Sequence, residues 1–207
     1  MKVFNRKSHW ESIYQTKELK DVSWHEPIPQ TSIDFFTQYK VSKTAKVIDI
    51  GGGDSLLVDH LVDMGYRDIT VLDISETAIN RAKKRLGQRA NKVNWIISDI
   101  SSFHPTEQYD FWHDRAAYHF LTREDEISSY IETASRHINP AGILVLGTFS
   151  EKGPKKCSGL EIKQYSESEL TNRFKHEFKK RICIEIDHKT PSGVFQNFVF
   201  CSFKKGS

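Results

Sequence analysis

Hydrophobic residues along the chain alternate between short continuous runs and amphipathic stretches. The runs cover residues 46–50, 68–73, 93–98, 109–113 and 142–149, and most are rich in Val, Ile and aromatic residues. Runs of this kind are typical of strands that are covered on both faces. Between them, apolar residues recur at helical spacing, as at Leu57, Leu61 and Met64, at Ala78, Ala82 and Leu86, and from Ile127 to Ile138. The alternation predicts five strand–helix units and a mostly parallel sheet.

The last forty residues change character. A helical pattern over residues 166–174 precedes residues 181–187, in which isoleucines alternate with other residues, and a second run covers 195–203. Because Pro191, Ser192 and Gly193 separate the two runs, we expect an antiparallel hairpin. The predicted fold class is therefore α/β, with a Rossmann-like, doubly wound and mostly parallel sheet that ends in an antiparallel C-terminal hairpin.

The first 45 residues are rich in aromatic residues and show helical patterns over 8–15 and 32–39. No linker or internal repeat separates this segment from the rest of the chain. We therefore expect one domain over residues 1–207, in which residues 1–45 cover the sheet and residues 46–207 form the core with the binding site.

Charge and cysteine content narrow the class of protein. The 207 residues carry a net charge of only +3, which is less than a dedicated nucleic-acid-binding protein needs. No apolar run is long enough for a membrane span, and the N-terminus does not resemble a signal peptide. Three widely spaced cysteines without a C-x-x-C motif predict reduced thiols, with neither a disulfide framework nor a structural metal site. These features favour a cytoplasmic enzyme.

The segment from Val47 to Ser55 (VIDIGGGDS) is the most informative part of the sequence. A buried strand leads directly into Gly51, Gly52 and Gly53, and Ser55 stands at the predicted start of a helix. Glycines allow the backbone to turn tightly and to approach a ligand closely. The helix N-terminus behind them offers free N–H groups to an anionic group. An ordinary tight turn would show the same glycines, so the motif needs support from elsewhere.

Two aspartates supply that support. Asp73 ends the second predicted strand, where a carboxylate can accept hydrogen bonds from the hydroxyls of a ribose. Asp99 ends the third, next to Ile100, where it can meet the amine of an adenine. Parallel strands end at one edge of the sheet, and ligands of such folds bind there. Either aspartate alone would also suit a helix N-cap.

An acid at the end of the second strand fits both NAD and S-adenosylmethionine. The dinucleotide motif requires a third glycine, but Leu56 occupies that position. S-adenosylmethionine has an amino-acid tail in place of a pyrophosphate, so this glycine is dispensable. The sequence therefore favours S-adenosylmethionine over an NAD-dependent oxidoreductase.

From about Lys46 to its end, the chain resembles class I S-adenosylmethionine-dependent methyltransferases. The similarity lies in the D-I-G-G-G-D-S turn, Asp73, Asp99 and the N-P-A-G sequence before the fifth strand. It implies a seven-stranded sheet, a methionine tail against Gly51 and Gly53, and no metal. The predicted cofactor contacts are Trp10, Trp24, Gly51, Gly53, Ser55, Asp73, Ile74, Asp99, Ile100, His113 and Arg115.

The end of the fourth strand faces the transferred methyl group in this family. Here it carries Asp114 and His119, which we predict to be catalytic, since His113 or His119 can accept a proton near neutral pH. Tyr118 and Cys157 are the predicted substrate contacts. The residues from Asp114 to Ala117 are similar to the Asp-Arg-Gly-Ala of thiopurine S-methyltransferase-like enzymes.

The acceptor predicted from this similarity is a small molecule with a thiol-like, soft nucleophile. A protein lysine is the alternative, although lysine methyltransferases of the elongation-factor type carry an acid where His119 stands. A non-catalytic S-adenosylmethionine-binding protein is an alternative of another class. We predict no nucleic-acid or membrane partner, and the sequence does not indicate the oligomeric state.

Overall fold

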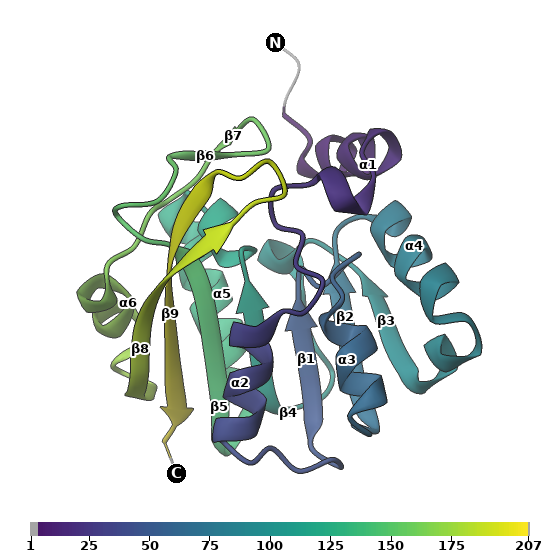
Figure 1. The fold of residues 1–207 in the computed structure, drawn as a ribbon. Coiled ribbons are helices and arrows are strands. Elements are labelled where there is room, and N and C mark those ends of the chain that lie inside the picture. Colours follow the sequence, from purple (N-terminus) through teal and green to yellow (C-terminus); the bar gives the residue numbers. More distant parts are fainter. Residues whose placement is uncertain (1–3, 207) are drawn as a thin grey trace.

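A seven-stranded sheet forms the centre of the protein, in the order β3-β2-β1-β4-β5-β9-β8 (Figure 1). The structure is a computed structural model and describes residues 4–206. Strands β1 to β5 run parallel, β9 pairs with β5 in the antiparallel direction, and β8 pairs antiparallel with β9. This arrangement confirms the predicted fold class. The strands are β1 (Lys46–Ile50), β2 (Asp68–Asp73), β3 (Val93–Ile97), β4 (Tyr109–Arg115), β5 (Ile138–Phe149), β8 (Phe178–Lys189) and β9 (Phe195–Lys205).

Helices cover the two faces of the sheet. Side chains of α2, α3 and α4 share one buried hydrophobic cluster with one face, and those of α5 and α6 share a second cluster with the other. Helix α1 lies beyond the carboxyl ends of the parallel strands, near the start of α4 (Figure 1). The helices are α1 (Arg6–Thr16), α2 (Gln30–Gln38), α3 (Leu57–Asp63), α4 (Glu76–Leu86), α5 (Glu124–His137) and α6 (Glu167–Phe174). Short 3₁₀ turns are η1 (Leu19–Asp21), η2 (Gly87–Lys92), η3 (Ile100–Ser102) and η4 (Tyr118–Phe120).

Side chains at the helix starts explain where the helices begin. Ser75 Oγ accepts a hydrogen bond from the N–H of Ala78, so α4 begins where the sequence predicted. Ser166 and Glu169 form a reciprocal capping box at the start of α6. Ser55 is an exception, because α3 begins only at Leu57, whose N–H donates to Ser55 Oγ at 3.1 Å.

Two boundaries differ from the sequence-based prediction. Helix α5 ends at His137, and Ile138 begins β5 instead of ending the helical stripe. The polar segment after β5, for which the sequence predicts no strand, contains a short hairpin of β6 (Lys156–Cys157) and β7 (Leu160–Glu161). Its two strands are only two residues each, which is too short for a hydrophobic period to be visible in the sequence.

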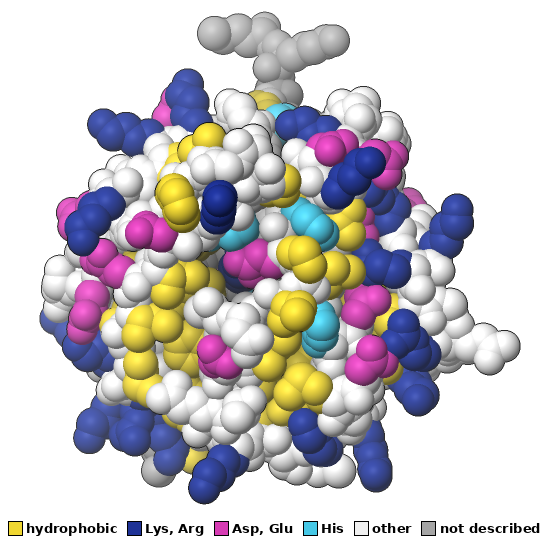
Figure 2. All heavy atoms as spheres, viewed as in Figure 1, with side chains coloured by type: hydrophobic (Ala, Val, Ile, Leu, Met, Phe, Trp, Pro, Cys, Tyr) yellow, Lys and Arg dark blue, Asp and Glu magenta, His cyan; other side chains and the backbone are white. Residues whose placement is uncertain are grey.

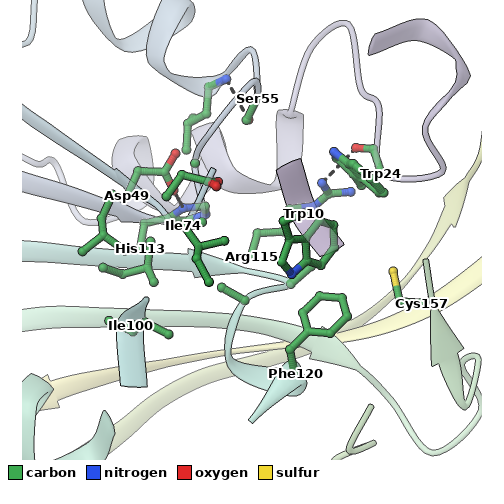
Figure 3. Close-up of a pocket in the computed structure, with 18 of the residues that line it drawn as sticks. Trp10, Trp24, Asp49, Ser55, Ile74, Ile100, His113, Arg115, Phe120 and Cys157 are labelled. Carbon is green, nitrogen blue, oxygen red and sulfur yellow. Dashed lines mark hydrogen bonds and ion pairs between the residues drawn. The ribbon is translucent and has the colours of Figure 1, made fainter. Parts of the chain in front are cut away.

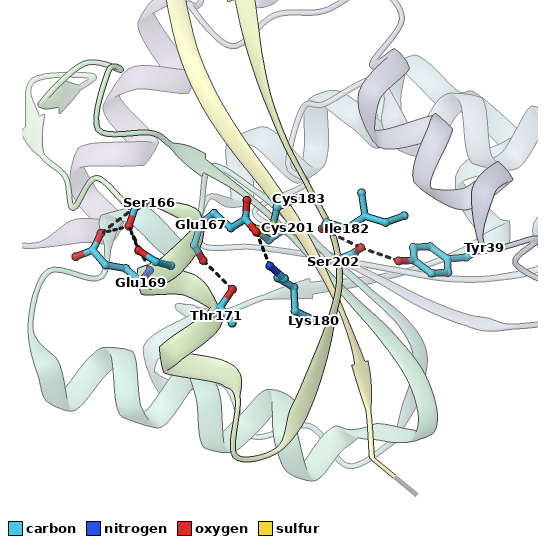
Figure 4. Close-up of a disulfide and its surroundings, with 11 residues drawn as sticks. Tyr39, Ser166, Glu167, Glu169, Thr171, Lys180, Ile182, Cys183, Cys201 and Ser202 are labelled. Atoms are coloured by element: carbon cyan, nitrogen blue, oxygen red, sulfur yellow. Dashed lines mark hydrogen bonds and ion pairs between the residues drawn. A yellow bond between two sulfur atoms is a disulfide. The ribbon is translucent and has the colours of Figure 1, made fainter.

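The prediction that all cysteines are reduced is wrong for two of them in this structure. Cys183 of β8 and Cys201 of β9 form a disulfide, while Cys157 is free and buried (Figure 4). The hairpin register places the two residues directly opposite each other, with Cα atoms 4.1 Å apart. The two cysteines are 18 residues apart and belong to no recognisable sequence motif. The sequence could not indicate this pair, because the register of the hairpin decides which residues face each other.

The surface and the chain ends complete the description. Lysine and arginine side chains alternate with acidic ones over the visible face, which is hollowed near its centre (Figure 2). Helix α1 and the end of β9 lie at opposite ends of the molecule (Figure 1). Within residues 4–206, no helix combines the length and the apolar character that crossing a membrane requires.

Candidate functional site

A cavity of about 1080 Å³, counted with the space at its mouth, opens at the carboxyl ends of β1, β2 and β4. This is the edge at which the sequence predicted a ligand. Its floor is the turn after β1, and one side is formed by the ends of β2 and β3. The other side is an aromatic wall that includes Trp10, Trp24, Phe120, Phe149 and Phe198 (Figure 3).

The glycine turn leaves room that any other residue would fill. Gly51 has φ +68°, and a Cβ there would lie 2.8 Å from the Cβ of Ala117. A Cβ on Gly53 would lie 2.4 Å from Oδ2 of Asp73. Both distances are below any real contact, so the turn after β1 requires glycine for steric as well as conformational reasons. At Gly51 and Gly52, which line the cavity, the main chain is exposed to a ligand without an intervening side chain.

Asp73 is buried at the bottom of the cavity. One of its oxygens accepts the N–H of Ser75 at 2.8 Å, and Ile74 beside it also lines the cavity. Burial raises the pKa of Asp73 to about 7, although the hydrogen bond from Ser75 opposes the shift. A ligand that donates hydrogen bonds to this buried carboxylate would stabilise its ionised form.

A buried chain of three polar side chains forms another part of the wall. Nδ1 of His113 lies 2.7 Å from Oδ1 of Asp49, and Nε2 lies 2.9 Å from Oγ of Ser32. All three residues line the cavity, and none is more than 3% exposed. The second oxygen of Asp49 is buried without a hydrogen-bond partner in the described chain, which suits a ligand with a cationic or N–H donor group.

Helix α1 closes the cavity from above and is fastened by charged side chains at several points. Arg6 pairs with Asp99 at 2.9 Å and with Glu126 at 2.8 Å. Oε1 of Glu11 accepts the N–H of Glu76 at the start of α4. Arg81 of α4 donates to the carbonyls of Tyr14 and Lys17, and also pairs with Asp54 in the glycine turn. These contacts hold α1, the helix that carries Trp10, against the segment after β3 and the first turns of α4.

Comparison with known proteins assigns the fold to a family. A family profile described as "Methyltransferase domain" matches residues 47–142. The N-methyltransferase NodS from Bradyrhizobium japonicum, solved with S-adenosyl-L-homocysteine, has a TM-score of 0.76 and 16% identity, covering 98% of this chain and all of that one.

Residues 47–142 thus match the methyltransferase-domain family, and the chain has the fold of class I S-adenosylmethionine-dependent methyltransferases.

Curated relatives differ in what they methylate. The eEF1A lysine and N-terminal methyltransferase of Mus musculus is 28% identical over 129 residues, which are 61% of this chain and 18% of that protein. The malonyl-[acyl-carrier protein] O-methyltransferase 2 of Ilyobacter polytropus is 23% identical over 106 residues, 51% of this chain and 39% of that protein. The chain therefore spans well under half the length of both methyltransferases.

The cavity fits S-adenosylmethionine. Gly51 and Gly52 line the cavity, Asp73 would accept the ribose hydroxyls, and the unpartnered oxygen of Asp49 suits the amino group of the methionine tail. Asp99 and Ile100 line the cavity at the end of β3, where the adenine was predicted. No group of three or more His, Cys, Asp or Glu residues in 4–206 is arranged to hold a metal ion.

The structure brings most of the predicted site residues to the cavity. Those that line it are Trp10, Trp24, Gly51, Ser55, Asp73, Ile74, Asp99, Ile100, His113, Arg115 and Cys157. Gly53 does not contact the cavity, but its missing side chain makes room for Asp73. Burial raises the pKa of the Cys157 thiol to about 11, so this residue lines the cavity as an uncharged thiol at physiological pH.

Besides Gly53, three predicted residues do not line the cavity, which removes the basis for their predicted roles. Asp114 is buried and accepts hydrogen bonds from the N–H groups of Ala117 and Tyr118 and from the hydroxyl of Tyr130. Tyr118 itself packs in the core against Tyr130. His119 is buried beside Phe149, and burial lowers its pKa to about 3, so it remains neutral. These residues support the end of β4 from behind.

Arg115 lines the cavity, where it contacts Trp24 and also Glu26 and Phe198, which the sequence analysis missed. Its Nη1 donates to the carbonyl of Trp24 at 3.1 Å, its Nη2 lies 3.0 Å from Glu26, and the guanidinium stands 5.3 Å from the ring of Phe198. Glu26 also pairs with His188 of β8 at 2.9 Å. Burial lowers the pKa of Arg115, and Glu26 opposes this shift.

We predict that Arg6→Ala weakens binding of S-adenosylmethionine about fivefold, which corresponds to about 1 kcal/mol for a half-buried ion pair. The reason is that α1, with Trp10, would lose its ties to Asp99 and Glu126. Isothermal titration at low and at high salt measures the effect, and the difference from the parent should shrink at high salt. The exposed Arg136 provides a control, because Arg136→Ala should bind the cofactor as the parent does.

Proposed function

We propose that the protein transfers the methyl group of S-adenosylmethionine to a small molecule with a thiol or a similarly soft nucleophile. The cofactor supplies an electrophilic methyl group on sulfur, and the electron pair of the acceptor displaces it, leaving S-adenosylhomocysteine and a proton. The protein's task is to orient the acceptor and to handle its charge.

The buried guanidinium of Arg115 in the aromatic wall is the observation that carries this proposal. A positive charge in a cavity of low dielectric favours a thiolate and disfavours an ammonium group, which a protein lysine would bring. The only carboxylate that contacts Arg115 among the described residues is Glu26, which also pairs with His188. The aromatic rings around the guanidinium suit a flat or aromatic acceptor.

A protein lysine is the second candidate, because four of the curated relatives are lysine and N-terminal methyltransferases. Incubation of the protein with tritiated S-adenosylmethionine and a cell extract separates the two candidates. Label in the small-molecule fraction supports our proposal. Label confined to one protein band would reject it.

We predict that Arg115→Met lowers kcat/KM for an arene thiol at least about tenfold, because the thiolate loses a charge-assisted partner worth about 1.5 kcal/mol or more. The same change should leave methylation of a neutral amine unchanged or improve it. Release of S-adenosylhomocysteine measures both rates. The matched control is Arg136→Met on the surface of α5, which removes the same charge far from the cavity. A rate for the thiol equal to that of the parent would contradict the role of Arg115.

A further inference from the structure

The chain of Asp49, His113 and Ser32 unites residues from β1, β4 and α2 that lie far apart in the sequence. The two distances, 2.7 Å and 2.9 Å, are those of ordinary hydrogen bonds, and the three side chains are buried in the wall of the cavity (Figure 3 labels Asp49 and His113). Strand register explains half of the arrangement, because Asp49 and His113 are paired residues of neighbouring strands. Ser32, in the first turns of α2, completes it.

Hydrogen-bond chemistry fixes the direction of this chain when the imidazole of His113 is neutral. An ionised carboxylate only accepts hydrogen bonds, so Nδ1 of His113 must carry the proton that it shares with Asp49. In a neutral imidazole, Nε2 is then the acceptor, and the hydroxyl of Ser32 must donate to it. The lone pairs of Ser32 Oγ remain free, since no N–H or O–H group of residues 4–206 donates to them within hydrogen-bond distance.

We propose that Ser32, His113 and Asp49 form a proton relay that removes the proton of the methyl acceptor. This inference rests on the proposed function only in requiring a protonated acceptor that enters the cavity. As the acceptor attacks, its proton passes to Ser32 Oγ while the hydroxyl proton of Ser32 passes to Nε2 of His113. Asp49 stabilises the resulting imidazolium, which returns the proton to solvent after the products leave. The proton released by methyl transfer is thus accounted for.

The surroundings of His113 are consistent with a transient positive charge. Asp49 faces the ring from β1, and on its own strand Asp114 and Arg115 are the neighbouring charged residues. From α2, Ser32 and the ring of Phe36, whose centroid is 6.3 Å away, pack against it. His119, the other histidine predicted to accept a proton, does not line the cavity.

Two probe acceptors that differ in protonation test the relay. An arene thiol is largely ionised near neutral pH, whereas a benzyl thiol is largely protonated, and both suit the aromatic wall. Ser32→Ala should lower kcat about 10²-fold for the benzyl thiol, as expected for loss of a general base. For the arene thiol, the loss should be about threefold or less, because no proton needs to be removed. Thr31→Ala, which removes the neighbouring hydroxyl of the same helix outside the cavity, is the matched control.

A readout that does not depend on turnover is the ¹⁵N spectrum of the His113 ring. The relay requires Nδ1 to be protonated and Nε2 to be unprotonated at neutral pH, and Ser32→Ala should shift the Nε2 signal. Cofactor affinity, measured by titration calorimetry, should stay within about threefold of the parent in Ser32→Ala if the variant is folded. His113→Gln serves as a second variant and should show the same selectivity between the two thiols.

The outcomes of these experiments distinguish failure of the proton relay from failure of the proposed acceptor. Equal losses for both thiols, or a doubly protonated ring of His113 at neutral pH, would overturn the relay and leave these residues with a structural role. If the protein methylates an amine or a phenol but neither thiol, the proposed acceptor is wrong, and the same comparison is made with that acceptor above and below its pKa. Failure to methylate any probe in this panel would overturn both proposals.

Discussion

Replacing Asp73 with asparagine should weaken binding of S-adenosylmethionine by about 10²- to 10³-fold. Two charge-assisted hydrogen bonds to the ribose hydroxyls would be lost, each worth about 1.5–3 kcal/mol, and a variant amide recovers part of this. Titration calorimetry at pH 8 measures the effect. Asp125→Asn, at an exposed position of α5, is the control. Affinity within threefold of the parent would show that Asp73 does not hold the ribose.

The pKa of Asp73 also predicts how binding depends on pH. Because burial raises this pKa from 3.8 to about 7, the carboxylate form that accepts both hydrogen bonds is populated only above about pH 7. Cofactor affinity of the parent should therefore fall as the pH decreases through 7, and that of Asp73→Asn should not.

In the cofactor-free protein, the contribution of Asp73 to the free energy of unfolding should decrease as the pH rises, whereas cofactor affinity increases. A raised pKa means that the folded state binds the proton more tightly than the unfolded state, so this group costs stability as the pH rises from about 4 to 7. Asp73→Asn should accordingly raise the melting temperature at pH 8 without cofactor. A lower melting temperature would contradict this account of the buried charge.

Replacing Asp114 with alanine should destabilise the fold by about 3–5 kcal/mol, because it leaves three buried donors without an acceptor. These are the N–H groups of Ala117 and Tyr118 and the hydroxyl of Tyr130. Urea unfolding at 25 °C measures the loss. Asp125→Ala, which removes an exposed carboxylate, should be within about 0.5 kcal/mol of the parent.

The same variant separates the two roles considered for Asp114. If the residue only caps the turn after β4, kcat measured at a temperature at which the variant remains folded should be close to that of the parent. A catalytic role would instead lower kcat with little change in the free energy of unfolding.

The parts of the site that sequence analysis located are those that depend on local features. Gly51 follows a buried strand directly, and Asp73 and Asp99 come at or just after strand ends, so their common edge follows from the parallel sheet alone. Ser32, Glu26 and His188 gave no such signal. Their contacts join α2 to β4, and the N-terminal segment to β8, so they depend on tertiary packing.

The residues after β4 show why direction is harder to predict than position. Tyr118 and His119 follow the right strand, yet they do not line the cavity. Asp114 lies on β4 itself, where the alternation of side chains along the strand puts it on the face opposite His113. Ala116 adopts φ +68°, a conformation that favours glycine, and turns the chain sharply between β4 and η4. Without a glycine at this position, the sequence predicts no turn of this kind, so the side chains beyond it were assigned to the wrong face.

The opposite placement of α1 and the end of β9 bears on how this protein is handled in the laboratory. Because α1 and its ion pairs close the cavity, a group attached at α1 adjoins this cover and risks altering cofactor affinity. The end of β9 lies on the far side of the molecule, next to Glu177, whose carbonyl accepts the N–H of Gly206. Attachment through the C-terminus would leave the mouth of the cavity free, so surface-immobilised binding measurements are best made in that orientation.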